Sequence, residues 1–149
     1  PVVRDTDRRF SCHMISAITN RGHLSFMVFK QTFTVSVMLR FLKRLLQENK
    51  RKIVLIADRH PVHRSAAVRT WLVKHRERIA LVFLPSYSPE LNPDEFLNQD
   101  VKTNAVGRRT NGTLGRMMRN VRTYLVRRRQ QPELVRRYFH HQDVRYALV

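Results

Sequence analysis

The chain has 149 residues, which suits one domain, since domains typically have about 100 to 150 residues. It carries 29 Lys and Arg residues against 11 Asp and Glu, for a formal net charge of +18. So basic a balance indicates a polyanionic partner such as nucleic acid, because Lys and Arg that neutralise phosphates release condensed counterions. The one cysteine excludes an intramolecular disulfide, and no apolar run approaches the roughly 20 residues of a membrane span.

Arginine supplies 23 of the basic residues, and its planar guanidinium matches phosphate oxygens bidentately. Codon bias in a high-GC genome is an alternative explanation of the Arg-to-Lys ratio, but it does not explain why acids are so scarce. The basic excess is densest in residues 101–149, which hold twelve basic and two acidic residues. We expect this region to form a basic helical tail appended to one domain.

The first elements in chain order form a hairpin followed by a helix. Residues 10–19 and 24–29 are apolar and rich in β-forming residues, and the connection between them holds Asn20 and Gly22, which suit a tight turn. From 34 to 47, apolar residues recur every three or four positions, which predicts an amphipathic helix.

The middle of the chain alternates strands and helices. Residues 53–57 are continuously apolar, which is typical of a strand buried on both faces of a sheet, and Asp58 follows directly. A helix over about 65–77 and a short strand over 79–84 come next. Together with the hairpin, this order predicts an α/β fold with a mixed sheet flanked by helices.

Prolines at 85, 89 and 93 exclude a helix in the next segment and stiffen it. Asn92 is a suitable N-cap, Pro93 suits the first helical position and Glu95 the third, so we expect a helix from here to about Ala105. Two basic helices should follow, over about 113–130 and from Pro132 to about His140.

Two acids occupy positions where catalytic acids are often found. Asp58 ends a predicted buried strand, where open α/β sheets present ligands, and Glu95 lies in the first turn of a helix. Two carboxylates that share a site repel unless divalent ions neutralise them, as in two-metal phosphoryl-transfer enzymes. The alternative is structural, with Asp58 a turn former and Glu95 closing a capping box on Asn92.

Two segments carry a family resemblance: IVLIADRHPVHRS at 53–65 and LPSYSPELNPDE at 84–95. They resemble the catalytic half of mariner-type bacterial transposases of the insertion sequence 630 family. The resemblance implies a ribonuclease-H-like fold whose Asp-Asp-Glu triad holds two Mg²⁺ (or Mn²⁺) ions for DNA cleavage and strand transfer. It makes Asp58 the second acid of the triad and Glu95 the third, with the adjacent Asp94 as a lesser candidate.

The first acid of the triad is not found in this chain. In the family it ends the first strand of the sheet, upstream of the segment that matches the start of this chain, whereas Asp5 and Asp7 lie in a polar stretch. We therefore expect an N-terminally truncated catalytic domain over 1–107, lacking its first strand, and Arg-rich C-terminal helices over 108–149 packed on it. The missing strand should leave the isolated chain marginally stable or prone to self-association.

The resemblance also implies DNA as partner, a homodimer acting on paired DNA ends, and a cytoplasmic, nucleoid-associated protein. A solvated basic face is the alternative role for any single arginine. A transposase remnant that binds DNA without cutting it is the alternative function. The candidates for contacting the DNA backbone are the arginines of the tail: Arg108, Arg109, Arg116, Arg119, Arg122, Arg127, Arg128 and Arg129.

Other residues invite weaker hypotheses. His60 and His63 could form a metal pair but lack a third close ligand, so a contact to phosphate or a cap suits His63 better. Trp71 fits a core position, while Tyr87, in the loop before Glu95, could stack on bases. Cys12 fits a buried strand position. No glycine-rich phosphate-binding loop is present, which argues against nucleotide hydrolysis.

Overall fold

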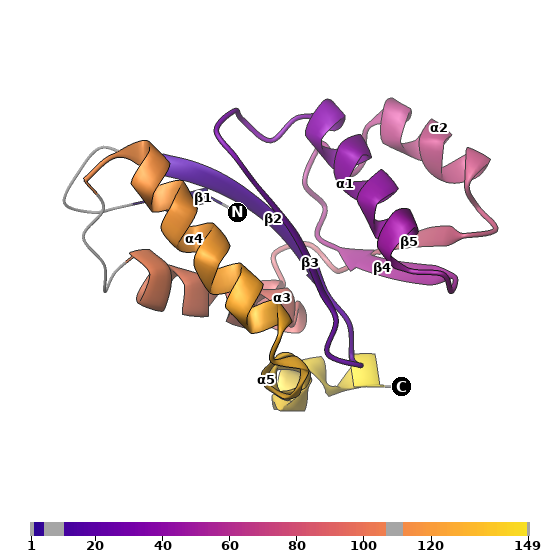
Figure 1. The fold of residues 1–149 in the computed structure, drawn as a ribbon. Helices are drawn as coiled ribbons and strands as arrows, with labels where there is room; N and C mark the ends of the chain where they lie inside the picture. The colour runs from indigo at the N-terminus through magenta and orange to yellow at the C-terminus, as the bar shows by residue number, and fades with distance from the viewer. Residues whose placement is uncertain (1, 5–10, 107–111, 149) are drawn as a thin grey trace. The chain divides into compact units, whose positions relative to one another are not determined.

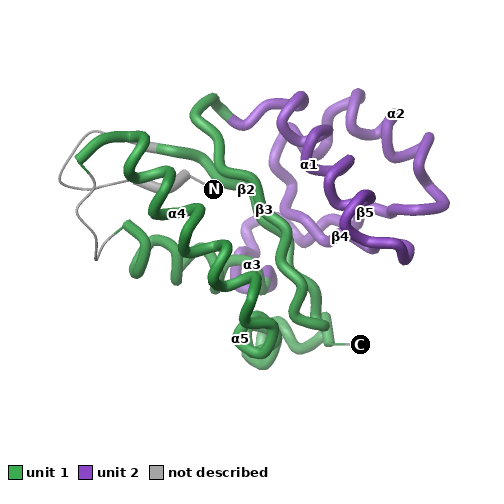
Figure 2. Tube along the Cα trace, in the orientation of Figure 1, with its two compact units in different colours: residues 1–32, 93–149 green, residues 33–92 purple. Residues whose placement is uncertain are grey.

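A computed structural model describes residues 2–4, 11–106 and 112–148 of the chain (Figure 1). The chain divides into two compact units (Figure 2): unit 1 combines residues 1–32 with 93–149, and unit 2 comprises residues 33–92. Several predicted features lie outside the described residues: Asp5, Asp7, Arg108, Arg109 and the domain boundary at 107.

Unit 1 contains an antiparallel sheet in the order β1-β2-β3, made of β1 Val2–Arg4, β2 Ser11–Ile18 and β3 Leu24–Phe29. The hairpin of β2 and β3 confirms the prediction. Its turn closes through Gly22, whose φ of +92° favours glycine and whose amide donates to Thr19 O at 2.9 Å. The sequence does not predict β1, because three residues are too few to show strand alternation.

The helices of unit 1 are α3 Asp94–Asp100, a π-helical turn Val101–Val106, α4 Leu114–Arg129 and α5 Pro132–Arg137, followed by 3₁₀ turns Tyr138–His140 and Gln142–Leu148. Thr113 caps α4 by accepting from the Arg116 amide at 3.1 Å. One apolar core joins the hairpin to these helices: Cys12, Met14, Leu24, Leu97, Val101, Ala105, Val106, Met117, Met118, Val121, Leu125, Val135 and Tyr138.

This shared core has a consequence for the organisation of the chain. The predicted helices after residue 112 are confirmed, and they complete the same core as the N-terminal hairpin. Residues distant in sequence therefore build unit 1, while a continuous segment builds unit 2. No helix among the described residues is long and apolar enough to cross a membrane.

Unit 2 contains α1 Val35–Glu48, β4 Ile53–Ala57, α2 Ala66–Lys74 and β5 Ile79–Phe83, as predicted, and a 3₁₀ turn Pro89–Leu91. The two strands pair in parallel. The N-caps of α1 and α2 are Thr34 and Ser65, whose hydroxyls accept from backbone amides three residues on. Their buried faces form the core of this unit with Ile79: Val37, Met38, Phe41, Leu42, Leu45 and Val68.

The sheets differ from the sequence prediction in two respects. The antiparallel and parallel strands lie in two sheets rather than one, because no strand among the described residues pairs with both sets. The prediction that β4 is buried on both faces is wrong, since Val54 is 62% exposed and Val82 on β5 is 50% exposed. Helices α1 and α2 lie over one face of this parallel pair (Figure 1). The apolar residues of 53–57 are continuous in sequence, so their pattern does not indicate that only one face is covered.

Candidate active site

The parallel pair of unit 2 places Asp58 and the proline-rich loop at one edge of its sheet. Ala57 and Phe83 are the last paired residues, and the ladder continues with the Leu84 amide donating to Ala57 O at 2.8 Å. Arg59 Nε donates to Leu84 O at 3.1 Å and ties the two strand ends together. Asp58 is therefore held at the carboxyl edge of the sheet, where open α/β sheets bind ligands.

One oxygen of Asp58 is held by the chain and the other is not. Oδ1 accepts from the His60 amide at 2.9 Å and lies 3.0 Å from His63 Nδ1. The hydrogen bond from His63 is the main cause that lowers the pKa of Asp58 to about 2, and the His60 amide adds to it against the opposing effect of partial burial. Oδ2 has no partner among the described residues. Asp58 therefore presents an ionised oxygen at the sheet edge.

The rings of the two histidines after Asp58 lie 5.8 Å apart, centroid to centroid, and both pack against Phe33. The ring centroid of Phe33 lies 5.3 Å from that of His60 and 5.6 Å from that of His63. His60 Nδ1 accepts from the Val62 amide at 3.1 Å, which commits that nitrogen to the loop. The described residues contain no group of three or more His, Cys, Asp or Glu side chains that could hold a metal. The loop thus serves to hold Asp58.

Glu95 and Asp94 open α3 in unit 1 and differ in their surroundings. Ser16 Oγ lies 2.8 Å from both carboxylate oxygens of Asp94 and donates to them. Burial raises the pKa of Asp94 to about 7, opposed by the Ser16 hydrogen bond and increased by the charge of Glu95. Glu95 is half-buried, and no described residue bonds to its side chain. Asp94 is thus engaged within the unit, while Glu95 keeps its ligand capacity.

The start of this helix lies close to the prediction. Helix α3 begins at Asp94, but Pro93 before it already has helical backbone angles, with φ −62° and ψ −24°, and Asn92 is extended. Asn92 also ends the preceding 3₁₀ turn, where its amide donates to Pro89 O at 3.0 Å. The Glu95 side chain makes no hydrogen bond back to Asn92 among the described residues, so the capping box that would have given Glu95 a structural role is not closed.

The donor set fits a divalent metal in its chemistry. Asp58 belongs to unit 2 and Glu95 to unit 1, and each offers carboxylate oxygen without a competing partner among the described residues. Mg²⁺ prefers oxygen ligands and is commonly bound by one or two protein carboxylates together with substrate phosphates and water. Each of these carboxylates is therefore chemically suited to ligate a metal that DNA helps to bind.

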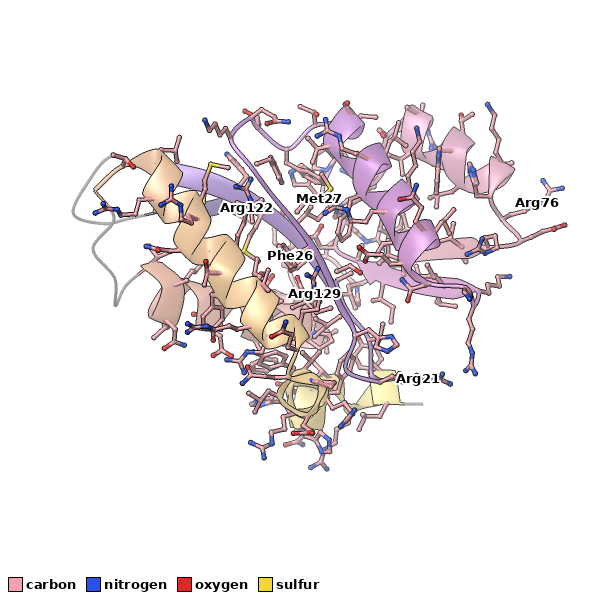
Figure 3. The ribbon with its side chains drawn as sticks, viewed as in Figure 1. Arg21, Phe26, Met27, Arg76, Arg122 and Arg129 are labelled. Carbon is pink, nitrogen blue, oxygen red and sulfur yellow. The ribbon has the colours of Figure 1, made fainter. Side chains whose placement is uncertain are left out.

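Most of the described candidate arginines lie on the outer side of α4. Arg116, Arg119 and Arg127 are exposed and make no hydrogen bond or ion pair through their side chains within the described chain. Arg122 Nη2 donates to Val28 O at 3.3 Å, and the Arg129 guanidinium lies 5.3 Å from the ring centroid of Phe26. Figure 3 shows both on the side of α4 that faces β3. These five arginines give α4 a basic face.

Arg128 is placed differently from the others. Its side chain is only 16% exposed, and Nη2 lies 2.6 Å from Tyr124 Oη and 3.9 Å from Asp100 Oδ2. Tyr138 also donates to Asp100 Oδ2, and burial together with this bond raises the pKa of Tyr138. Arg128 follows the buried Leu125 by three positions, and residues three apart lie on the same side of a helix. This spacing is the feature of the sequence that could have indicated that Arg128 faces inward.

Cys12 and Trp71, which the sequence also singles out, both make contacts within the fold. Cys12 is fully buried, as predicted, and burial raises the pKa of its thiol. Trp71 is only half-buried and stacks on His75, with ring centroids 4.0 Å apart, so it is not the core residue that the sequence predicts.

Comparisons with solved structures show the fold. The chain is similar to the Mos1 chain in the "Mos1 Strand Transfer Complex", with a TM-score of 0.71, 17% identity, and coverage of 93% of this chain and 41% of that chain. It is also similar to the catalytic domain of Mos1 mariner transposase, with a TM-score of 0.67, 15% identity, and coverage of 93% and 70%. This likeness confirms the expected α/β, ribonuclease-H-like fold.

The chain spans about two fifths of the length of the Mos1 chains in their DNA complexes. No curated protein sequence matches it significantly. The family model described as "DDE superfamily endonuclease" matches residues 1–117, which is most of the chain. The chain therefore belongs to the DDE superfamily endonuclease family.

Proposed function

We propose that this chain is the catalytic part of a mariner-type DNA transposase of the insertion sequence 630 family, which cleaves DNA and transfers strands. The observation that carries the proposal is Asp58, within the family match, with one oxygen held by His63 and the other open at the sheet edge. A carboxylate kept ionised and fixed in this way is suited to hold a divalent cation.

Asp58 and Glu95 would hold the metal ions, two Mg²⁺ or Mn²⁺ in a complete site. When bound, these ions supply activation of the attacking oxygen and stabilisation of charge on the leaving one. The His60 amide and His63 keep Asp58 deprotonated and oriented. The first acid of the triad is assigned to no residue of this chain.

The basic face of α4 would follow the phosphate backbone of DNA. Arg116, Arg119 and Arg127 are the foremost candidates because their guanidinium groups have no partner among the described residues, and Arg122 and Arg129 extend the same face. Arg108 and Arg109 remain candidates by sequence. A homodimer is proposed because transposition joins two DNA ends.

The second candidate function is a DNA-binding module that does not cleave. It is favoured by the assignment of only two triad acids, Asp58 and Glu95, to this chain, because two carboxylates alone hold two metal ions poorly. The two candidates share the basic face and differ only in whether Asp58 acts on DNA.

Nicking of a supercoiled plasmid carrying the cognate ends separates the two functions. Nicking that requires Mg²⁺ or Mn²⁺ would support the transposase, and Asp58→Asn and Glu95→Gln should then abolish it with DNA affinity retained. Glu90→Gln, at an exposed acid in the proline-rich loop, is the matched control and should nick normally. Salt-dependent binding without nicking would support the module, and nicking that persists in Asp58→Asn would refute the assigned site.

A further inference from the structure

Tyr87 stands apart from every other large side chain of unit 2. Its side chain is fully exposed, and it makes no hydrogen bond, ion pair or ring contact within the described chain. Its φ is +56°, and no other described non-glycine residue has a positive φ. Left-handed backbone at a bulky residue is unfavourable by about 1 kcal/mol or more, and such positions concentrate at functional sites.

The turn that carries Tyr87 is stiff and anchored. Pro85 and Pro89 flank it, and Ser88 Oγ donates to Ser86 O at 3.2 Å across the residue. Buried Leu84 fixes the entrance through its ladder bond to β4, and the 3₁₀ turn that begins at Pro89 fixes the exit. The backbone of the turn is therefore held on both sides of Tyr87, and the ring is exposed.

The turn also lies on the same edge of the sheet as Asp58. Asp58 follows the carboxyl end of β4, and the segment to Tyr87 follows the carboxyl end of β5, which pairs with β4 in parallel. Both residues belong to unit 2. A single bare aromatic ring and an unpartnered carboxylate oxygen are thus presented by one sheet edge.

The surroundings of Tyr87 favour a small flat ligand over a protein surface. Protein interface hot spots lie within a ring of other contact residues that excludes water, whereas Ser86 and Ser88 flank this tyrosine and no other large apolar side chain of the turn is exposed. A nucleobase offers one ring face, and stacking on an aromatic side chain tolerates any base. The chain's net charge of +18 supplies the attraction for the attached phosphates.

We infer that Tyr87 is a nucleobase-stacking residue that receives an unpaired base of the DNA strand whose phosphate lies at Asp58. This inference rests on the proposed function and adds a base contact that the metal-holding acids do not provide. It implies a preference for DNA ends with unpaired bases, since a base within an intact duplex has no free face.

The test is binding of two DNA probes without divalent metal. One is a duplex with a short single-stranded end that carries 2-aminopurine, whose fluorescence falls on stacking, and the other is the same duplex with blunt ends. Tyr87→Ala should weaken binding of the overhang probe about 5- to 100-fold and abolish the quenching, and it should leave the blunt duplex unaffected. Tyr87→Phe and Tyr87→Trp should retain both properties. Tyr146→Ala, at an exposed tyrosine in unit 1, is the matched control and should behave as wild type.

Three outcomes would overturn the inference. Tyr87→Ala could match the wild type on the overhang probe, Tyr87→Leu could restore quenching without an aromatic ring, or Tyr87→Ala could lower the melting temperature and so reveal a structural role. Tyr87→Gly should keep or raise the melting temperature, because glycine relieves the backbone strain. Failure of the proposed function looks different, since the wild type would then not nick the plasmid, whether or not it binds the overhang probe.

Discussion

His63 Nδ1 lies 3.0 Å from Asp58 Oδ1, so a histidine five residues further along the chain fixes one oxygen of the acid at the sheet edge. The His63 side chain is 13% exposed, whereas that of Asp58 is 64% exposed. A partly buried donor on an exposed carboxylate orients the acid without covering it. A residue that hydrogen-bonds to a metal ligand in this way influences the affinity of the site for the metal.

Loss of the His63 donor should weaken metal binding. We expect His63→Ala to reduce Mn²⁺ affinity, measured by EPR titration, and plasmid nicking by about 10- to 100-fold. His63→Asn should recover much of both, because its amide nitrogen can approach the position of Nδ1, whereas the longer glutamine of His63→Gln should not. His75→Ala, at a histidine that stacks on Trp71, is the control. Unchanged Mn²⁺ affinity in His63→Ala would contradict this positioning role.

Asp94 should make stability fall as pH rises. Its pKa is about 7 in the folded chain against an ordinary value of 3.8, so between these values the folded state binds the proton that the unfolded state releases. Stability therefore decreases from about pH 4 to pH 7 and levels off above it. Asp94→Asn, neutral at every pH, should raise the melting temperature at pH 8 and change it little at pH 4. The control Glu133→Gln, at an exposed acid of α5, should keep the wild-type pH profile; an identical profile in Asp94→Asn would refute the prediction.

The outer arginines of α4 should determine how DNA affinity depends on salt. A variant combining Arg116→Ala, Arg119→Ala and Arg127→Ala should lower the slope of log affinity against log salt by up to about 3, since each phosphate contact contributes about 0.9. Fluorescence anisotropy over a salt series measures this slope. Arg128→Ala is the contrast, because its guanidinium bonds to Tyr124 and lies near Asp100. It should lower stability by about 1–3 kcal/mol and keep the slope, and a slope change equal to that of an outer arginine would refute this distinction.

Gly22 should tolerate no side chain. A Cβ at this position would lie 2.4 Å from Pro132 O and 2.8 Å from Pro132 Cβ, and the φ of +92° is itself unfavourable for other residues. Gly22→Ala should therefore destabilise unit 1 by roughly 1–3 kcal/mol, measured by chemical unfolding. Gly115→Ala, where a Cβ in α4 would make only an ordinary contact with Thr113 Oγ1 at 3.9 Å, should be neutral or slightly stabilising. Equal stability of the two variants would show that the hairpin turn does not pack against α5.

The sequence by itself determined the features that depend on neighbours along the chain. The hairpin, the amphipathic helices α1 and α4, and the strand that ends at Asp58 follow from periodicity and turn residues, which act over a few positions. The motifs at 53–65 and 84–95 also make Asp58 and Glu95 candidates from the sequence alone, because each residue lies within a contiguous segment.

Only the tertiary structure decided which surfaces these elements share. Arg128 looks like its neighbours in sequence, but Asp100 and Tyr124 make it a partly buried residue. The sequence predicts that Gly22 lies in a turn. Only the structure shows that Pro132, 110 positions away, leaves no room there for a side chain. Asp94 and Glu95 are adjacent acids that Ser16 of the hairpin distinguishes. In each case the deciding atom comes from a distant part of the chain, and local sequence patterns carry no information about packing at that range.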